Sequence, residues 1–158
     1  MRSFLRGFVY AFNGIYAAVK QERNFRFHLC AAVYIYALSA FYPFDKTQYV
    51  LITILIAGVL ALELVNSALE RTVSRPSPKR YVTAGVVKDM AAGAVLVFSI
   101  GAAVCGFILF WDIERFVYIA NWFIDKPVAF ILLVASLAAS WWFIFMFGRP
   151  RTKKGDSI

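Results

Sequence analysis

The sequence predicts an all-α integral membrane protein, in which an N-terminal amphipathic interfacial helix precedes several apolar spanning helices. Of the 158 residues, 61% are hydrophobic, which is well above the roughly 45–50% of soluble globular domains. The apolar runs are continuous and do not alternate with polar residues, which favours helices over strands as spanning elements. Lipid is therefore the expected solvent for much of the chain.

The N-terminal segment is predicted to be an amphipathic helix lying in the membrane interface. Its apolar side chains recur one, three or four residues apart, as on one face of a helix. They are Phe4, Phe8, Ala11, Ile15, Ala18 and Val19. Basic residues and Asn13 interrupt the apolar run, so a secretory signal peptide is not expected. A soluble-type helix packed on protein is the alternative, and the apolar character of the whole chain disfavours it.

Four apolar stretches are predicted to span a bilayer, whose hydrocarbon core of about 30 Å needs about 20 helical residues. They are residues 29–43, 49–69, 86–111 and 128–147. The first is short by this measure and is expected to extend back into residues 25–28. Residues 112–126, between the third and fourth spans, mix charged and aromatic side chains and are expected to form an interfacial helix on the opposite face.

The basic residues predict how these segments are oriented. All but three of the 17 Lys and Arg residues lie in the N-terminal segment, in residues 71–88 or in the C-terminal tail. The exceptions are Lys46, Arg115 and Lys126. The positive-inside rule therefore places both termini and residues 71–88 on the cytoplasmic side of a multi-pass protein of the cell membrane. Topology and attraction to anionic membrane lipids explain the net charge of +8, so no nucleic-acid partner is expected.

The clearest chemical signal lies in the second span, where Glu63, Asn66 and Glu70 are spaced so that they share one helix face. The two carboxylates are about 10 Å apart along the axis. An ionised side chain costs roughly 2.5–3.5 kcal/mol or more near the bilayer centre, so this face needs a partner or an ion. A catalytic or ion-binding role is favoured over a packing stripe that meets Lys or Arg of another helix.

Three further charged residues are predicted to join this face. Glu22 lies near the cytoplasmic interface with Glu70, where the two carboxylates can share a divalent cation such as Mg²⁺. Taken alone, Glu22 is also explained as a solvated charge or as the partner of Arg26 four residues on. Lys88 and Asp89 begin the third span. A membrane anchor and a helix-dipole partner are the alternatives for this pair.

Other familiar sites are missing from the sequence. It contains no GxxxxGK[ST] loop, no His/Cys metal constellation and no Ser-His-Asp set. The single histidine, His28, is expected to be structural, and Cys30 and Cys105 are expected to be packing residues. A transporter with a proton relay is disfavoured because the acids cluster near the cytoplasmic side and only Glu63 lies deeper.

Two motifs carry a resemblance to a known family. Glu63-Leu-Val-Asn66-Ser-Ala-Leu-Glu70, followed by Lys88-Asp89-Met-Ala-Ala-Gly-Ala-Val, resembles the signature of the bacterial integral-membrane diacylglycerol kinase and undecaprenol kinase family. The pieces Tyr10-Ala-Phe-Asn-Gly14 and Glu22-Arg-Asn-Phe-Arg26 look like its opening helix. The resemblance covers about residues 3–111 and implies a lipid kinase domain over 1–111. That domain has an amphipathic helix and three spans, and it assembles as a homotrimer with its sites between subunits. Residues 112–158 are then an extension with an interfacial segment and a fourth transmembrane helix.

The resemblance also implies roles for individual residues. They are Glu63 and Asn66 as catalytic residues, Glu22 and Glu70 as metal ligands that hold the nucleotide through the metal, and Tyr10, Lys88 and Asp89 as nucleotide contacts. The general base for the lipid hydroxyl is Glu63. The implied cofactor is Mg²⁺ or another divalent metal, with ATP as co-substrate. Phosphoryl transfer asks mainly for positioning and charge neutralisation, which this set of side chains supplies.

The resemblance favours undecaprenol over diacylglycerol as the lipid alcohol, because the ERNFR-type opening and the lack of an acidic loop look like the undecaprenol branch. Diacylglycerol is the alternative substrate. The family usually has Asp where this chain has Ser74, and residues 76–81 are more basic than usual. Altered metal or nucleotide affinity is therefore expected. Ser74 also favours the competing hypothesis of a non-catalytic membrane assembly protein.

Overall fold

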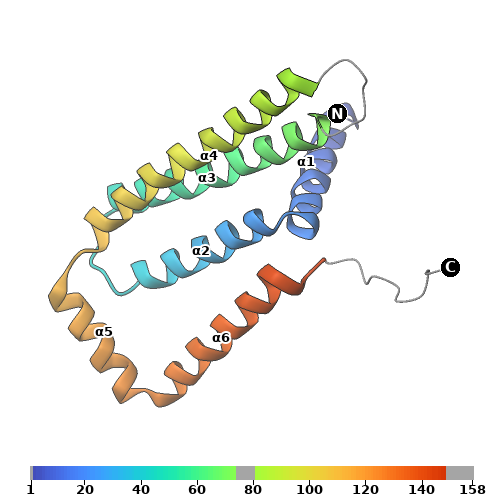
Figure 1. The fold of residues 1–158 in the computed structure, drawn as a ribbon. Helices are drawn as coiled ribbons and strands as arrows, with labels where there is room; N and C mark the ends of the chain where they lie inside the picture. Colours follow the sequence, from blue (N-terminus) through green and yellow to red (C-terminus); the bar gives the residue numbers. More distant parts are fainter. Residues whose placement is uncertain (1, 74–80, 149–158) are drawn as a thin grey trace.

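Six α-helices and no strand make up the described part of the chain, residues 2–73 and 81–148 of a computed structural model (Figure 1). The helices are α1 (Arg2–Gln21), α2 (Arg23–Ser39), α3 (Lys46–Val73), α4 (Tyr81–Phe110), α5 (Ile113–Asp125) and α6 (Pro127–Met146). In Figure 1, α3 and α4 lie side by side and α2 runs beside them, while α1 crosses one end. Helix α6 lies on the side of α2 that faces away from α3 and α4. The predicted all-α integral membrane fold is confirmed.

Three helices are long and apolar enough to cross a membrane among the residues described: α3, α4 and α6. They correspond to the predicted spans 49–69, 86–111 and 128–147. The remaining predicted span, residues 29–43, falls on α2, which has 17 residues. At 1.5 Å per residue it is about 26 Å long, slightly less than the hydrocarbon core. Its crossing of the membrane therefore stays a prediction.

The ends of the helices have local causes. Helix α2 ends at Ser39, before the predicted residue 43, because a residue preceding proline disfavours helical geometry and Pro43 follows soon after. Helix α3 begins with a reciprocal cap. The Gln48 backbone N–H donates to Asp45 Oδ1 at 2.9 Å, and the Asp45 N–H donates to Gln48 Oε1 at 2.8 Å. The Asp112 carboxylate caps α5 by accepting from the Arg115 N–H at 3.0 Å.

Helices α3 and α4 have the most extensive contact of any helix pair among the described residues. Gly58 on α3 allows this close approach, since a Cβ there would overlap the ring of Phe98 on α4. Elsewhere the buried apolar side chains are few, and most of the large apolar side chains of α4 and α6 are exposed. Exposed apolar helix surface is expected where the surrounding solvent is lipid.

The C-terminal helix α6 is fastened to the junction of α1 and α2 by Arg26, whose side chain is buried. The guanidinium donates to the carbonyl of Ile144 near the end of α6, at 2.9 and 3.2 Å. It also donates to the carbonyls of Val19 and Lys20 at the end of α1, at 3.0 and 3.3 Å. Each of these carbonyls lies in the last turn of a helix, where the helix itself leaves acceptors unpaired. Arg26 therefore ties three helices together through backbone acceptors.

We expect Arg26→Met to lower the free energy of unfolding by about 2–4 kcal/mol, because it leaves the partly buried carbonyls of Val19 and Ile144 without this donor. Thermal unfolding in detergent, followed by circular dichroism, measures the loss. The matched control is Arg23→Met. Arg23 lies over the Phe145 ring at 5.8 Å and its loss should cost less than about 1 kcal/mol. Equal unfolding midpoints for the two variants would show that Arg26 does not fasten α6.

Candidate active site

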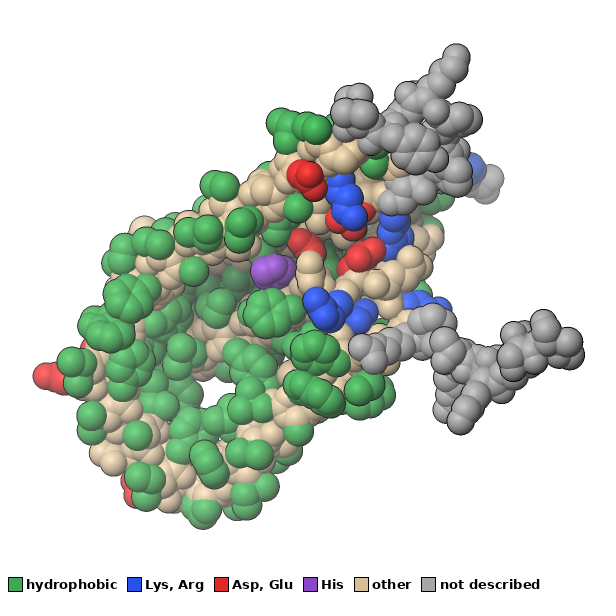
Figure 2. All heavy atoms as spheres, in the orientation of Figure 1, with side chains coloured by type: hydrophobic (Ala, Val, Ile, Leu, Met, Phe, Trp, Pro, Cys, Tyr) green, Lys and Arg blue, Asp and Glu red, His purple; other side chains and the backbone are tan. Residues whose placement is uncertain are grey.

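Of the polar face predicted on the second span, Glu63 and Asn66 are buried in the structure, whereas Glu70 is partly exposed. Helix α3 places Glu63, Asn66 and Ser67 within one turn, and only 3%, 8% and 6% of their respective surfaces are exposed. Figure 2 shows acidic and basic side chains gathered where α1 crosses the ends of α3 and α4, while most of the rest of the visible face is hydrophobic. A buried carboxylate beside a buried amide needs a functional or structural partner. Within the described residues, no Lys or Arg forms an ion pair with Glu63.

The two other glutamates of the predicted site lie at the same end of α3. Glu70 Oε1 is 3.7 Å from Lys88 Nζ, which joins α3 to the start of α4. Glu22 Oε1 is 2.9 Å from Arg71 Nη2, which joins the α1–α2 junction to α3. Glu63 lies two turns before Glu70 on the same face of α3, and Figure 2 shows acidic side chains gathered at this end of the molecule. The structure therefore brings Glu22, Glu63, Glu70 and Lys88 to one region, although they come from separate helices.

The predicted alternative pairing of Glu22 with Arg26 is wrong. Glu22 pairs with Arg71 instead, and Arg26 donates to backbone carbonyls of other helices. The spacing rule behind the expectation requires both residues to lie in one continuous helix. Glu22 is the break between α1 and α2, with extended backbone angles of −105° and 115°. Its side chain is therefore free to reach α3.

The donor set of this region fits a hard divalent cation that arrives with phosphate. Mg²⁺ is commonly held by one or two carboxylates together with substrate phosphates, and seldom by a full protein cage. Glu22 and Glu70 supply the carboxylates. The side-chain oxygen of Asn66 is buried and has no hydrogen-bond partner, which is unusual for a buried acceptor and marks a place for a ligand. Among the described residues, no group of three or more His, Cys, Asp or Glu side chains could hold a metal.

The remaining predicted site residues are at the surface of this single chain. Tyr10 on α1 is 70% exposed, and its hydroxyl makes no hydrogen bond to any described residue. Asp89 is also exposed, next to Lys88 on α4. The structure thus does not bring these two against Glu63. Ser74 and most of the basic loop, residues 74–80, lie outside the described residues.

Two residues of this region were not predicted from the sequence. Ser67 is buried on the polar face of α3 and lies four residues after Glu63, so helical spacing alone could have identified it. Arg71 is the partner of Glu22. No sequence spacing reveals that contact, because it joins segments that only the packing of α1 on α3 brings together.

Comparison with known proteins finds similarity to bacterial diacylglycerol and undecaprenol kinases. The family described as prokaryotic diacylglycerol kinase matches residues 9–110. The undecaprenol kinase of Bacillus subtilis is 36% identical over 110 residues, which cover 70% of this chain and 89% of that protein. The diacylglycerol kinase of Haemophilus influenzae is 33% identical over 103 residues, 65% of this chain and 87% of that protein. The diacylglycerol kinase of Synechocystis sp. is 32% identical over 105 residues, 66% of this chain and 60% of that protein.

Proposed function

This chain belongs to the prokaryotic diacylglycerol kinase family and is a membrane lipid kinase that uses ATP, and from that premise we propose that its acceptor is undecaprenol. The observation that carries this choice is the identity of 36% with the undecaprenol kinase of Bacillus subtilis, against 30–33% with the diacylglycerol kinases. The opening Glu22-Arg-Asn-Phe-Arg26 supports the same branch. Diacylglycerol is the second candidate, because the relatives that are 30–33% identical are named diacylglycerol kinases.

We propose that Glu63 is the general base. Its carboxylate takes the proton of the lipid hydroxyl while the hydroxyl oxygen forms a bond to the γ-phosphorus of ATP. The bond from that phosphorus to the bridging oxygen breaks, and ADP leaves with the electron pair. Asn66 lies one turn away, and its side-chain amide N–H can donate to the oxygen of the acceptor hydroxyl while Glu63 takes the hydroxyl proton. The burial of Glu63 supports this role, since a base in a dry site acts on the hydroxyl without competition from water.

The nucleotide approaches from the charged end of α3. Lys88, already 3.7 Å from Glu70, is proposed to meet the phosphates, with Asp89 and Tyr10 as further nucleotide contacts. Glu22 and Glu70 are the residues that would hold a divalent metal. When bound, such a metal neutralises the charge of the phosphate oxygens. Base and metal ligands are then different side chains. Glu63 and Glu70 share one face of α3, Glu22 reaches it from the α1–α2 junction, and the lipid and the nucleotide meet without leaving their own phases.

The assembly and orientation follow from the family resemblance and the charges. We propose a homotrimer in which a second subunit completes the nucleotide site. The exposure of Tyr10 and Asp89 in the single chain agrees with that arrangement. Both termini and the charged end of α3 are proposed to face the cytoplasm, because the basic residues concentrate there and only Lys46, Arg115 and Lys126 lie at the other end.

A competition assay tests the choice of acceptor. Purified protein in detergent receives Mg²⁺, γ-labelled ATP and an equimolar mixture of undecaprenol and diacylglycerol, and the labelled lipids are separated. We expect most of the label in undecaprenyl phosphate at early times. Predominant labelling of diacylglycerol would overturn the choice. Absence of any labelled lipid from folded protein would favour the non-catalytic alternative that Ser74 suggests.

A further inference from the structure

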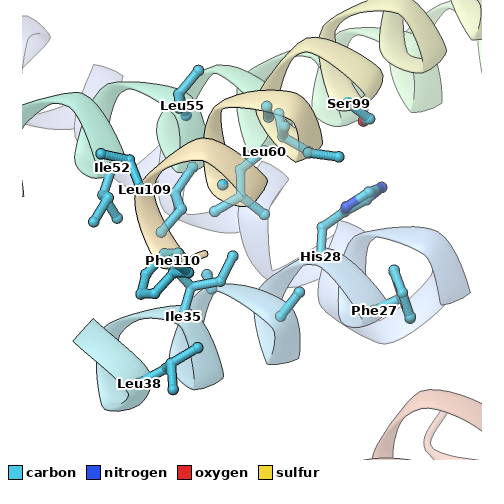
Figure 3. Close-up of a pocket in the computed structure, with 17 residues that line it drawn as sticks. Phe27, His28, Ile35, Leu38, Ile52, Leu55, Leu60, Ser99, Leu109 and Phe110 are labelled. Atoms are coloured by element: carbon cyan, nitrogen blue, oxygen red, sulfur yellow. The ribbon is translucent and has the colours of Figure 1, made fainter. Parts of the chain in front are cut away.

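An apolar pocket of about 390 Å³ opens between α2, α3 and α4 (Figure 3). This volume lies within the range of about 300–1,000 Å³ that is usual for ligand pockets. His28 and Ser99 lie at one end of the view, and Ile52 and Phe110 lie toward the other. Apart from these two polar residues, the lining is aliphatic and aromatic. Its chemistry suits a hydrocarbon and excludes a nucleotide.

The pocket continues the face of α3 that carries the candidate active site. Ile52, Ile56 and Val59 line it, and the next positions at the same three- and four-residue spacing are Glu63 and Asn66. On α4, Ser99 and Gly106 lie on the face that also carries Lys88, since they are separated by whole numbers of turns. One continuous strip therefore runs from the carboxylates into the apolar pocket.

Small residues give the pocket its width. Ala31 and Ala32 on α2 face Ala102, Ala103 and Gly106 on α4. Leu and Ile dominate the rest of the lining, and either of them at one of these five positions would occupy part of the pocket. The Ser99 hydroxyl is buried and has no hydrogen-bond partner within the described chain. The space that these small residues leave can hold a methyl-branched hydrocarbon chain.

We propose that this pocket binds the part of the polyprenyl tail next to the hydroxyl, so that the hydroxyl is presented to Glu63. The inference rests on the proposed acceptor and adds the place where its tail is recognised. Phe98 on α4 lies against Gly58 on α3, so these two residues are at about the same level along the helix axes. At 1.5 Å per residue, Glu63 lies about 8 Å from that level along α3. Gly106 lies about 12 Å from it along α4, in the opposite direction. A tail must therefore span roughly 20 Å from the base to reach Gly106.

The chain offers a matched pair of substitutions for the test. Gly106 and Gly101 both lie on α4, and a Cβ at either would meet nothing within 4 Å. Only Gly106 lines the pocket. Gly106→Leu and Gly101→Leu therefore make the same change in one helix, and only the first fills the proposed tail site. Gly106→Ala is a smaller step at the same position.

Initial rates are measured for these variants with undecaprenol and with geraniol, whose tail is too short to reach Gly106. We expect Gly106→Leu to raise the KM for undecaprenol about tenfold or more, with a smaller rise for Gly106→Ala. The kcat and KM for geraniol should not change. Gly101→Leu should behave as wild type with both acceptors.

Three results would contradict the proposal, and they distinguish a wrong tail site from a wrong acceptor. An unchanged KM for undecaprenol in Gly106→Leu would overturn the tail site while leaving the proposed function intact. Loss of activity on geraniol as well, with an altered oligomeric mass, would assign the pocket to a contact between copies of the chain and overturn the proposal. If wild-type protein phosphorylates diacylglycerol and not undecaprenol, both the proposed acceptor and the polyprenyl assignment of the pocket fall.

Discussion

Glu63→Gln is expected to lower kcat by about 10²- to 10⁴-fold, the usual contribution of a positioned general base. The substitution keeps the shape of the side chain and removes its ability to accept the proton of the lipid hydroxyl. Because the residues proposed to hold the metal are Glu22 and Glu70, binding of Mg²⁺-ATP should persist. Steady-state rates with undecaprenol, together with nucleotide binding by isothermal calorimetry, measure the two effects separately.

Asn66→Ala is the companion variant for this prediction. It removes the buried acceptor one turn from Glu63 but leaves the base, so its kcat should fall less than that of Glu63→Gln. Near-normal turnover in Glu63→Gln would mean that positioning alone carries the reaction. Loss of nucleotide binding together with turnover would place Glu63 in the metal or nucleotide site.

Glu70→Gln and Glu22→Gln are expected to raise the Mg²⁺ concentration for half-maximal activity by about tenfold or more, equivalent to roughly 1.4 kcal/mol of binding energy. Each removes one of the two carboxylates proposed to hold the metal. Activity measured over a range of Mg²⁺ concentrations should show partial recovery at high Mg²⁺. Glu114→Gln makes the same change on α5, far from this region, and should leave the Mg²⁺ dependence unchanged.

The ion pair between Glu22 and Arg71 offers a rival explanation for Glu22. Arg71→Gln breaks the same pair and keeps the carboxylate. If the role of Glu22 is to hold metal, Arg71→Gln should retain the wild-type Mg²⁺ dependence, while Glu22→Gln should not. Equal loss in both variants, without recovery at high Mg²⁺, would show that Glu22 acts through the ion pair.

Much of the fold follows directly from the sequence because hydropathy and local caps determine it. The spans at 49–69, 86–111 and 128–147 correspond to α3, α4 and α6, since long apolar runs have few alternatives to a helix. The face of α3 that carries Glu63, Asn66 and Glu70 follows from helical spacing alone. The cost of leaving such groups in lipid predicted that this face needs a partner or an ion.

Contacts between helices were harder to predict from the sequence. The pair of Glu22 with Arg71 depends on the break in the helix at Glu22, which no spacing rule encodes. Pairing of Arg26 with Glu22 was one alternative for Glu22, and Arg26 instead binds carbonyls near the ends of α1 and α6. Tyr10 and Asp89 lie at the surface of the single chain, so the nucleotide contacts proposed for them need the proposed homotrimer.

A single-turnover experiment tests the central claim most directly, namely that phosphate passes straight from ATP to a lipid hydroxyl at the carboxylate face of α3. Excess protein with undecaprenol and Mg²⁺ receives γ-labelled ATP, and the label is followed in nucleotide, lipid, protein and free phosphate after rapid quenching. We predict that the label moves from ATP to undecaprenyl phosphate in the wild-type protein without appearing on the protein. In Glu63→Gln it should remain in bound ATP. Label that accumulates on the protein, or that appears only as free phosphate, would contradict direct transfer.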